Sequence, residues 1–174
     1  MHKNYKTYYL IIFISILWIA GCKKPESFPI EPAITELTFS RSPEEKVLLS
    51  FRFTDGDGDL GLNAEDTLSP FGCQPNANGN CENKYYNNIL INQYNKENDV
   101  WVKQNIELNG RFLRIETTGK NKALNGEIDF DMSDIFPGNL AVNLGDTIKY
   151  EIQIIDRTLH ESNILETNDI ILTP

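Results

Sequence analysis

The stretch Asp146–Asp156, with the sequence DTIKYEIQIID, decides the fold class of this chain. Its apolar residues stand at every second position until Ile155, which breaks the polar face. This two-residue period is that of a β-strand with one buried face. The same alternation occurs in Val47–Thr54. The two segments predict a protein built from half-buried strands.

Six further segments have the length and composition of strands, and turn-forming residues separate most of them. They are Ile34–Ser40, Tyr86–Tyr94, Val100–Ile106, Arg111–Thr117, Leu124–Phe130 and Asn168–Thr173. Asn95–Asp99 predicts a hairpin turn, and Ser133 could cap a single helical turn at Ser133–Phe136. About eight short strands predict an all-β domain, an antiparallel β-sandwich of immunoglobulin-like type.

The N-terminal segment 1–21 has the properties of a targeting sequence. Lys3 and Lys6 precede the apolar run Leu10–Ala20, which as a helix would cover only about 16 Å, roughly half of a bilayer core. This arrangement is typical of a secretory signal peptide. The end of the segment and the next residue form Ile19-Ala20-Gly21-Cys22, which resembles the lipobox of bacterial lipoproteins.

The resemblance to a lipobox implies that Cys22 becomes the first residue of the mature protein and carries acyl chains such as palmitate. Stable anchoring in a lipid bilayer needs more than one chain. We therefore expect a lipoprotein of the cell envelope, held to the outer membrane and facing the periplasm or the medium. An ordinary signal peptide followed by a chance cysteine is the alternative.

Residues 22–32 are rich in charges and prolines and form neither a good helix nor a good strand. We interpret them as a tether between membrane and domain, and we expect the domain to span 33–174. Lys23, Lys24 and Glu26, just after the cysteine, resemble the surface-export signal of Bacteroidetes-type lipoproteins.

The mature chain is strongly acidic. The whole chain has 16 basic and 25 acidic residues, and segment 1–21 contains two of the basic ones and none of the acidic ones, which leaves 14 against 25 and a net charge of −11. Such a surface argues against nucleic acid as a partner. It also leaves carboxylates for cations, although a solvated surface accounts for most of them.

Once Cys22 is assigned to lipid, Cys73 and Cys81 remain as a pair in an exported, oxidising setting. They lie in the connection from Asp55 to Lys84, which shows little periodicity and is longer than ordinary loops of compact domains. A disulfide here would constrain the unfolded chain by about 2.5 kcal/mol. A zinc site is the alternative, but the mature chain's one histidine is distant in sequence.

The same connection begins with Asp55-Gly56-Asp57-Gly58-Asp59. Glycines allow the backbone to curl and gather the three carboxylates, which then repel each other by on the order of 3 kcal/mol per pair. A bound cation would reverse this repulsion, and calcium accepts six to eight oxygens in flexible geometry. An EF-hand is excluded because Leu60 replaces its invariant glycine and because the flanking segments are strands.

The stretch Phe53–Gly61 resembles the Asp-Gly-Asp loop of cadherin-like and PKD-like extracellular domains, many of which bind calcium between strand ends. The last strand pair, with Asp156 between its strands, also resembles theirs. In an immunoglobulin-like sandwich both loops lie at the same end. We therefore expect four calcium ligands, with three additional candidates, and a solvated turn as the alternative. The ligands are Asp55, Asp57, Asp59 and Asp156, and the additional candidates are Asn63, Asp66 and Asn163.

Catalytic motifs are missing from the sequence: it has no nucleophile elbow, no histidine pair and no phosphate-binding loop. His160 stands alone in a predicted turn. We therefore expect no enzymatic activity and a structural or protein-binding module. The alternative is a carbohydrate-binding accessory lipoprotein of a glycan-uptake system, in which exposed rings would stack on sugars. These rings are Tyr85, Tyr86, Tyr94 and Trp101, for which packing within the sheet is the competing role.

Overall fold

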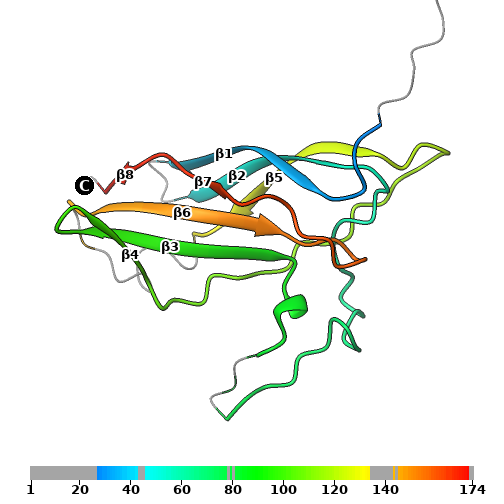
Figure 1. Ribbon diagram of the computed structural model, residues 1–174, viewed down its shortest axis with the longest axis horizontal. Helices are drawn as coiled ribbons and strands as arrows, with labels where there is room; N and C mark the ends of the chain where they lie inside the picture. The colour runs from blue at the N-terminus through cyan, green and yellow to red at the C-terminus, as the bar shows by residue number, and fades with distance from the viewer. Residues whose placement is uncertain are drawn as a thin grey trace, which may run out of the picture.

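The computed structural model describes residues 27–42, 46–77, 79, 81–133, 143 and 145–172. In this part of the chain two antiparallel sheets lie one above the other (Figure 1). The first sheet has the order β1-β2-β5, with β1 (Ala33–Arg41), β2 (Val47–Asp55) and β5 (Leu124–Asp131). The expected all-β antiparallel sandwich is confirmed.

The second sheet has the order β4-β3-β6-β7, and β8 also pairs with β6. Its strands are β3 (Ile89–Glu97), β4 (Val100–Lys103), β6 (Thr147–Ile154), β7 (Leu165–Glu166) and β8 (Ile170–Ile171), and a short 3-10 helix, η1 (Lys84–Tyr86), precedes β3. The first, second and fifth strands thus face the other five. The fold is an immunoglobulin-like sandwich in which the fourth strand lies in the sheet of the third and sixth.

The core lies between β2 and β6, the central strands of the two sheets. Both strands alternate buried and less buried residues as the sequence predicts. Tyr150 brings a polar group into this core, and its hydroxyl donates a hydrogen bond to Gln93 Oε1 at 3.3 Å. The Gln93 amide donates in turn to Asn95 Oδ1 at 2.8 Å, so this buried chain of polar groups is hydrogen-bonded.

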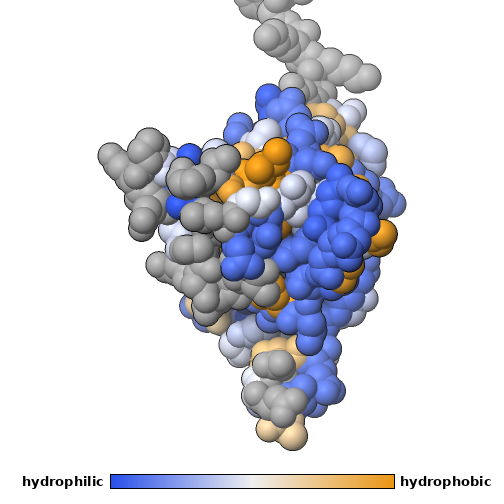
Figure 2. All heavy atoms as spheres, turned by 90° about the vertical axis from the view of Figure 1, so that its left-hand side faces the viewer, coloured by the Kyte–Doolittle hydropathy of each residue, from blue (hydrophilic) through white to orange (hydrophobic). Residues whose placement is uncertain are grey.

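One end of the molecule is largely hydrophilic at its surface. Figure 2 views the molecule from the end that carries β8 and the turn between β3 and β4, and hydrophilic residues predominate among those coloured there. Within the described residues, no helix has the length and hydropathy needed to cross a bilayer.

The turn between β3 and β4 is tighter than the sequence predicts. Glu97 pairs with Val100, so the turn itself consists of Asn98 and Asp99, with φ values of 49° and 64°. Two positive φ angles define a type I′ turn, whose twist matches that of the strands. Asn and Asp tolerate this conformation, so the polar residues Asn95–Glu97 remain in the ladder.

Four strand predictions need correction. Arg111–Thr117 is not a strand: it runs beside the long connection, where Leu62 N donates to Phe112 O and Ile115 N to Leu60 O, both at 3.1 Å. Its partner is an irregular loop instead of a strand, so the segment forms no regular ladder. Val100–Ile106 shortens to β4, and Asn168–Thr173 shortens to β8, with β7 as an additional short strand. The strand expected at Tyr86–Tyr94 is shifted to β3, because Tyr86 belongs to η1. The expected helical turn lies, except for Ser133, outside the described residues.

The placement of the core predicts that two isoleucines of the second sheet contribute very differently to the free energy of unfolding. Ile152 is 0% exposed and Ile171 is 65% exposed. We expect Ile152→Ala to lower the free energy of unfolding by about 2–5 kcal/mol, because it leaves a cavity, and Ile171→Ala to change it by less than about 0.5 kcal/mol. Urea denaturation measures both. Equal losses in the two variants would contradict the placement of the core.

Candidate metal centre

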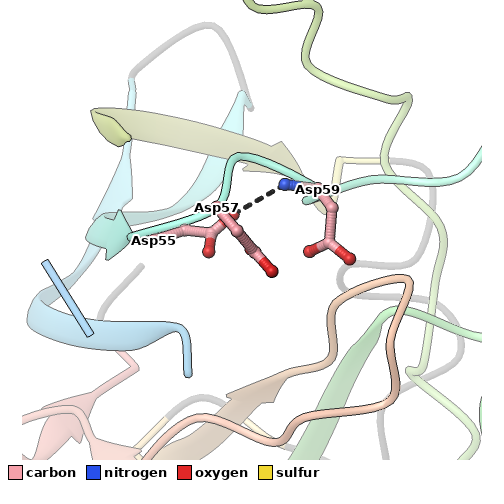
Figure 3. A group of neighbouring side chains, drawn as sticks. All are labelled: Asp55, Asp57 and Asp59. Atoms are coloured by element: carbon pink, nitrogen blue, oxygen red, sulfur yellow. Dashed lines mark hydrogen bonds between the residues drawn. The ribbon is translucent and has the colours of Figure 1, made fainter. Parts of the chain in front are cut away.

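The acidic loop begins where β2 ends, and Asp55 is the last residue of that strand. Asp55 continues the inward direction of Phe51 and Phe53, as the sequence predicts, and it is 0% exposed. Figure 3 shows the side chains of Asp55, Asp57 and Asp59 projecting to the same side of the loop. One oxygen from each lies within 4.8 Å of the others. The structure therefore brings together three of the four expected ligands, called here the aspartate cluster.

Glycines allow the loop to pass through a narrow space. A Cβ added at Gly58, where φ is +70°, would lie 2.0 Å from Lys122 O. A Cβ added at Gly56 would lie 2.3 Å from Phe28 O. Real Cβ atoms do not approach backbone oxygens so closely, so neither position has room for a side chain. The three aspartates are thus presented by a backbone that is enclosed on two sides.

Each member of the aspartate cluster has an unsatisfied oxygen. The Oδ1 atoms of Asp55, Asp57 and Asp59 are buried and have no hydrogen-bond partner. The second oxygen of Asp55 accepts a hydrogen bond from Asp59 N at 3.0 Å (Figure 3). Burying charged oxygens without partners is costly, and unit charges 4.8 Å apart repel by on the order of 3 kcal/mol at an effective dielectric of 20. A cation among the three oxygens would remove both costs.

The titration of the cluster reflects both its burial and this repulsion. Burial raises the pKa of Asp55 to about 7, and the charges of Asp57 and Asp59 act in the same direction. Burial also raises the pKa of Asp59, with the charges of Asp156 and Asp57 adding to it. Without a cation, the cluster therefore holds a proton near neutral pH that isolated carboxylates would have lost.

Asp156, the fourth expected ligand, is positioned beside the cluster by a β-bridge to Leu60. It is 2% exposed, but its oxygens are already bonded. Oδ1 accepts from His160 N at 2.7 Å and from Thr158 Oγ1 at 3.2 Å, and Oδ2 contacts His160 Nδ1 at 2.8 Å. The structure does not include Asp156 in the group of three.

The contacts of Asp156 hold an unusual turn. Leu159 has a φ of 72°, a conformation that costs free energy for a residue other than glycine and persists only when its surroundings enforce it. The hydrogen bond to Asp156 raises the pKa of His160. Sequence reasoning missed this pair, although the spacing of four residues across a predicted turn was a signal for it.

The side chains of Asp66 and Asn163, two of the three additional candidates, form other contacts. Asp66 forms a two-pronged ion pair with Arg157, one contact of which is Nη2 to Oδ1 at 3.2 Å, and this contact lowers the pKa of Asp66. Asn63 N donates to Asp66 Oδ2 at 2.7 Å. Asn163 Oδ1 accepts from Ile34 N at 2.8 Å, and its Nδ2 donates to Ile34 O at 3.0 Å. These contacts attach the long connection and β1 to the turn after β6.

The expected disulfide is present: Cys73 and Cys81 are bonded, with 5.2 Å between their Cα atoms. It closes the part of the long connection that projects away from the two sheets (Figure 1). Cys22 lies outside the described residues.

Two of the four aromatic rings, those of Tyr94 and Trp101, share one face of the second sheet. Tyr94 and Trp101 are half-buried on the outer face of the second sheet, with Lys149 Nζ 5.4 Å and 5.0 Å from their ring centres. Tyr86 lies before β3 under Arg111, at 5.0 Å. Tyr86 and Tyr94 are eight positions apart, which corresponds to at most about 26 Å of extended chain.

A scan against protein-family models, a search of curated proteins and a search of solved structures each found no match to this chain. The fold and the site define an antiparallel β-sandwich with a cluster of three aspartates enclosed at one end.

The raised pKa of Asp55 predicts how the metal-free protein responds to pH. The folded state keeps a proton between pH 3.8 and about 7 that the unfolded chain loses, so stability falls as pH rises through this range. In a chelator at pH 7.5, Asp55→Asn should be at least about 1 kcal/mol more stable than the parent, because the amide carries no buried charge. Urea denaturation at pH 5 and pH 7.5 measures this effect.

Asp99→Asn is the matched control, since Asp99 lies in the exposed turn between β3 and β4. The His160 pKa is also raised and acts in the same direction, but this contribution is present in the parent and in both variants. The same pH dependence in the parent and in Asp55→Asn would contradict the assignment to Asp55.

Proposed function

We propose that the protein is a lipid-anchored envelope lipoprotein whose β-sandwich is a non-catalytic structural or protein-binding module, stabilised by calcium at the aspartate cluster. One observation carries the proposal: Asp55, Asp57 and Asp59 each bury a carboxylate oxygen that has no hydrogen-bond partner, and these residues gather oxygens within 4.8 Å.

The chemistry of the donors favours calcium. All three side chains offer hard carboxylate oxygens, whereas zinc prefers nitrogen and sulfur ligands. Magnesium demands near-ideal octahedral geometry and keeps most of its water. Calcium accepts more oxygens at longer and more variable distances, which suits an enclosed loop supported on two sides by backbone.

The position of the cluster favours a structural role for the ion. Asp55 is 0% exposed, so an ion bound to it would be shielded by protein. The loop that carries the cluster is bridged to the turn after β6 and contacts the segment before β1. An ion at this point would hold together segments from both sheets. Because it would bind the folded state only, it would stabilise that state by about 2.7 kcal/mol when the free ion concentration is one hundred times Kd.

The disulfide supports an exported location. Bonded cysteines are rare in reducing compartments and common in the periplasm and outside the cell, and Cys73 and Cys81 are bonded. The lipid anchor itself is proposed from the motif at Cys22.

Calcium titration tests the metal proposal. At millimolar calcium, the range in which extracellular sites bind, the melting temperature of the parent should rise because the ion binds the folded state only. Asp57→Asn should lose the shift, since it removes one charged ligand, and Asp99→Asn should keep it. An unchanged melting temperature of the parent would eliminate calcium as the stabilising ion.

Fractionation of cells tests the anchor. We expect the parent to sediment with membranes and to incorporate radioactive palmitate, because stable anchoring requires acyl chains. Cys22→Ser should incorporate none and should leave the membrane fraction. If the variant carries as much palmitate as the parent, the acylation site is not Cys22.

A further inference from the structure

The part of the long connection that projects from the two sheets (Figure 1) contains an open hollow of about 670 Å³. Small-molecule sites in proteins have volumes of about 300–1,000 Å³, and connections of this length inside a compact domain usually have a function. The hollow is lined by residues between 67 and 85 and shares none of them with the aspartate cluster. It is therefore a candidate site separate from the proposed calcium site.

Several contacts fix the walls of this hollow. The Asn83 side chain joins its two sides, because Nδ2 donates to Pro70 O at 2.6 Å and to Gly72 O at 2.8 Å. Its Oδ1 accepts a hydrogen bond from Tyr85 N at 3.0 Å. The disulfide holds Cys73, another lining residue. Because these contacts exist before any ligand arrives, binding would order few further groups of the protein.

The lining of the hollow is amphipathic and carries little charge. Leu68, which is 81% exposed, and the half-buried Tyr85 offer apolar surface. Gln74 and Glu82 offer polar groups. Glu82 is the one charged residue of the lining, and its carboxylate already accepts a hydrogen bond from Asn76 Nδ2 at 3.3 Å. Among the described residues, neither the Gln74 side chain nor the Tyr85 hydroxyl forms a hydrogen bond, so both are available to a ligand.

Tyr85 differs in its surroundings from the other three rings considered from the sequence. Those three rings each lie beside a cationic side chain, which is Lys149 for two of them and Arg111 for the third. Tyr85 lines the hollow instead. It is therefore the ring that combines aromatic surface with an adjacent concave space.

This lining distinguishes between classes of ligand. An anion would meet the Glu82 carboxylate and no cationic partner. A lipid chain would leave the Gln74 amide and the Tyr85 hydroxyl without hydrogen bonds, which is costly. A basic peptide would find a single carboxylate. A sugar offers hydroxyl groups that both donate and accept, as amide, carboxylate and phenol groups require, and C–H faces that pack against apolar and aromatic surface.

We propose that this hollow, between residues 67–74 and 82–85, binds a neutral carbohydrate. The Tyr85 ring packs against a C–H face of the sugar, and Gln74 and Glu82 form hydrogen bonds with its hydroxyl groups. The protein then has two sites with different tasks. The aspartate cluster stabilises the sandwich, and the hollow contacts the ligand.

Binding of the mature chain, in detergent, to an array of neutral gluco-, galacto- and manno-oligosaccharides tests this proposal. Isothermal titration calorimetry then gives the affinity for a sugar that binds. We expect Tyr85→Ala to weaken this affinity at least tenfold, because the variant lacks the ring on which the sugar packs. Tyr94→Ala is the matched control on the outer face of the second sheet, and its affinity should stay within twofold of the parent. If no arrayed sugar binds, or if Tyr94→Ala loses the binding and Tyr85→Ala keeps it, the proposal is wrong.

Gln74→Ala decides the matter if Tyr85→Ala does not fold. Gln74 is exposed, so its truncation should leave the melting temperature unchanged while weakening sugar binding at least threefold, through the loss of a hydrogen bond. Parental affinity in a folded Gln74→Ala variant would overturn the proposal. An oligolysine peptide is the competing probe: if it binds where no sugar does, and Glu82→Gln abolishes its binding, the ligand of the hollow is basic and not a carbohydrate.

Discussion

Burial of the Asp55 carboxylate at the end of β2 is the constraint around which this end of the molecule is organised. The alternation that directs Phe51 and Phe53 into the core places a charge, instead of an apolar side chain, at the next inward position. This buried carboxylate needs hydrogen-bond donors, and the chain supplies one, the backbone N–H of Asp59. The same curl of the loop that supplies this bond gathers two further carboxylates. Two glycines without room for a side chain, the bridge to the turn after β6 and the packing of the tether all border on this one loop.

The contrast with neighbouring acidic residues shows why this cluster stands apart. Asp156 follows β6 as Asp55 ends β2, and it is almost as deeply buried. However, its oxygens are bonded to His160 and Thr158. Asp66 is paired with Arg157. In the described part of the chain, the aspartate cluster combines close carboxylates with buried oxygens that lack a partner. The acidic composition of the chain therefore does not by itself account for the candidate metal site. What distinguishes the site is that its buried carboxylate oxygens have no partner, whereas those of Asp156 and Asp66 do.

The long connection after β2 has three parts with different roles. Its first residues carry the aspartate cluster and are enclosed by backbone. Its middle is attached to the sandwich by the Arg157–Asp66 pair and by stacking of Arg157 on Phe71, at 5.6 Å. Its last part projects from the sheets and is closed by the disulfide. Cross-links of this kind compensate for the few backbone ladders that an irregular segment can form.

The sequence by itself determined the features that depend on local order. Alternation along Val47–Thr54 and Asp146–Asp156 predicted the two central strands and the buried direction of Asp55, because side-chain direction in a strand changes with every residue. Spacing predicted the disulfide and the gathering of three aspartates. Only the tertiary structure decided which polar groups find partners. Arg157 reaches Asp66 across 91 residues and Asn163 reaches Ile34 across 129, and Arg111–Thr117 lost its strand because no strand lies beside it. Such pairings depend on the packing of distant segments, which no local pattern encodes. For the same reason, the sequence could not show that the tether passes against Gly56.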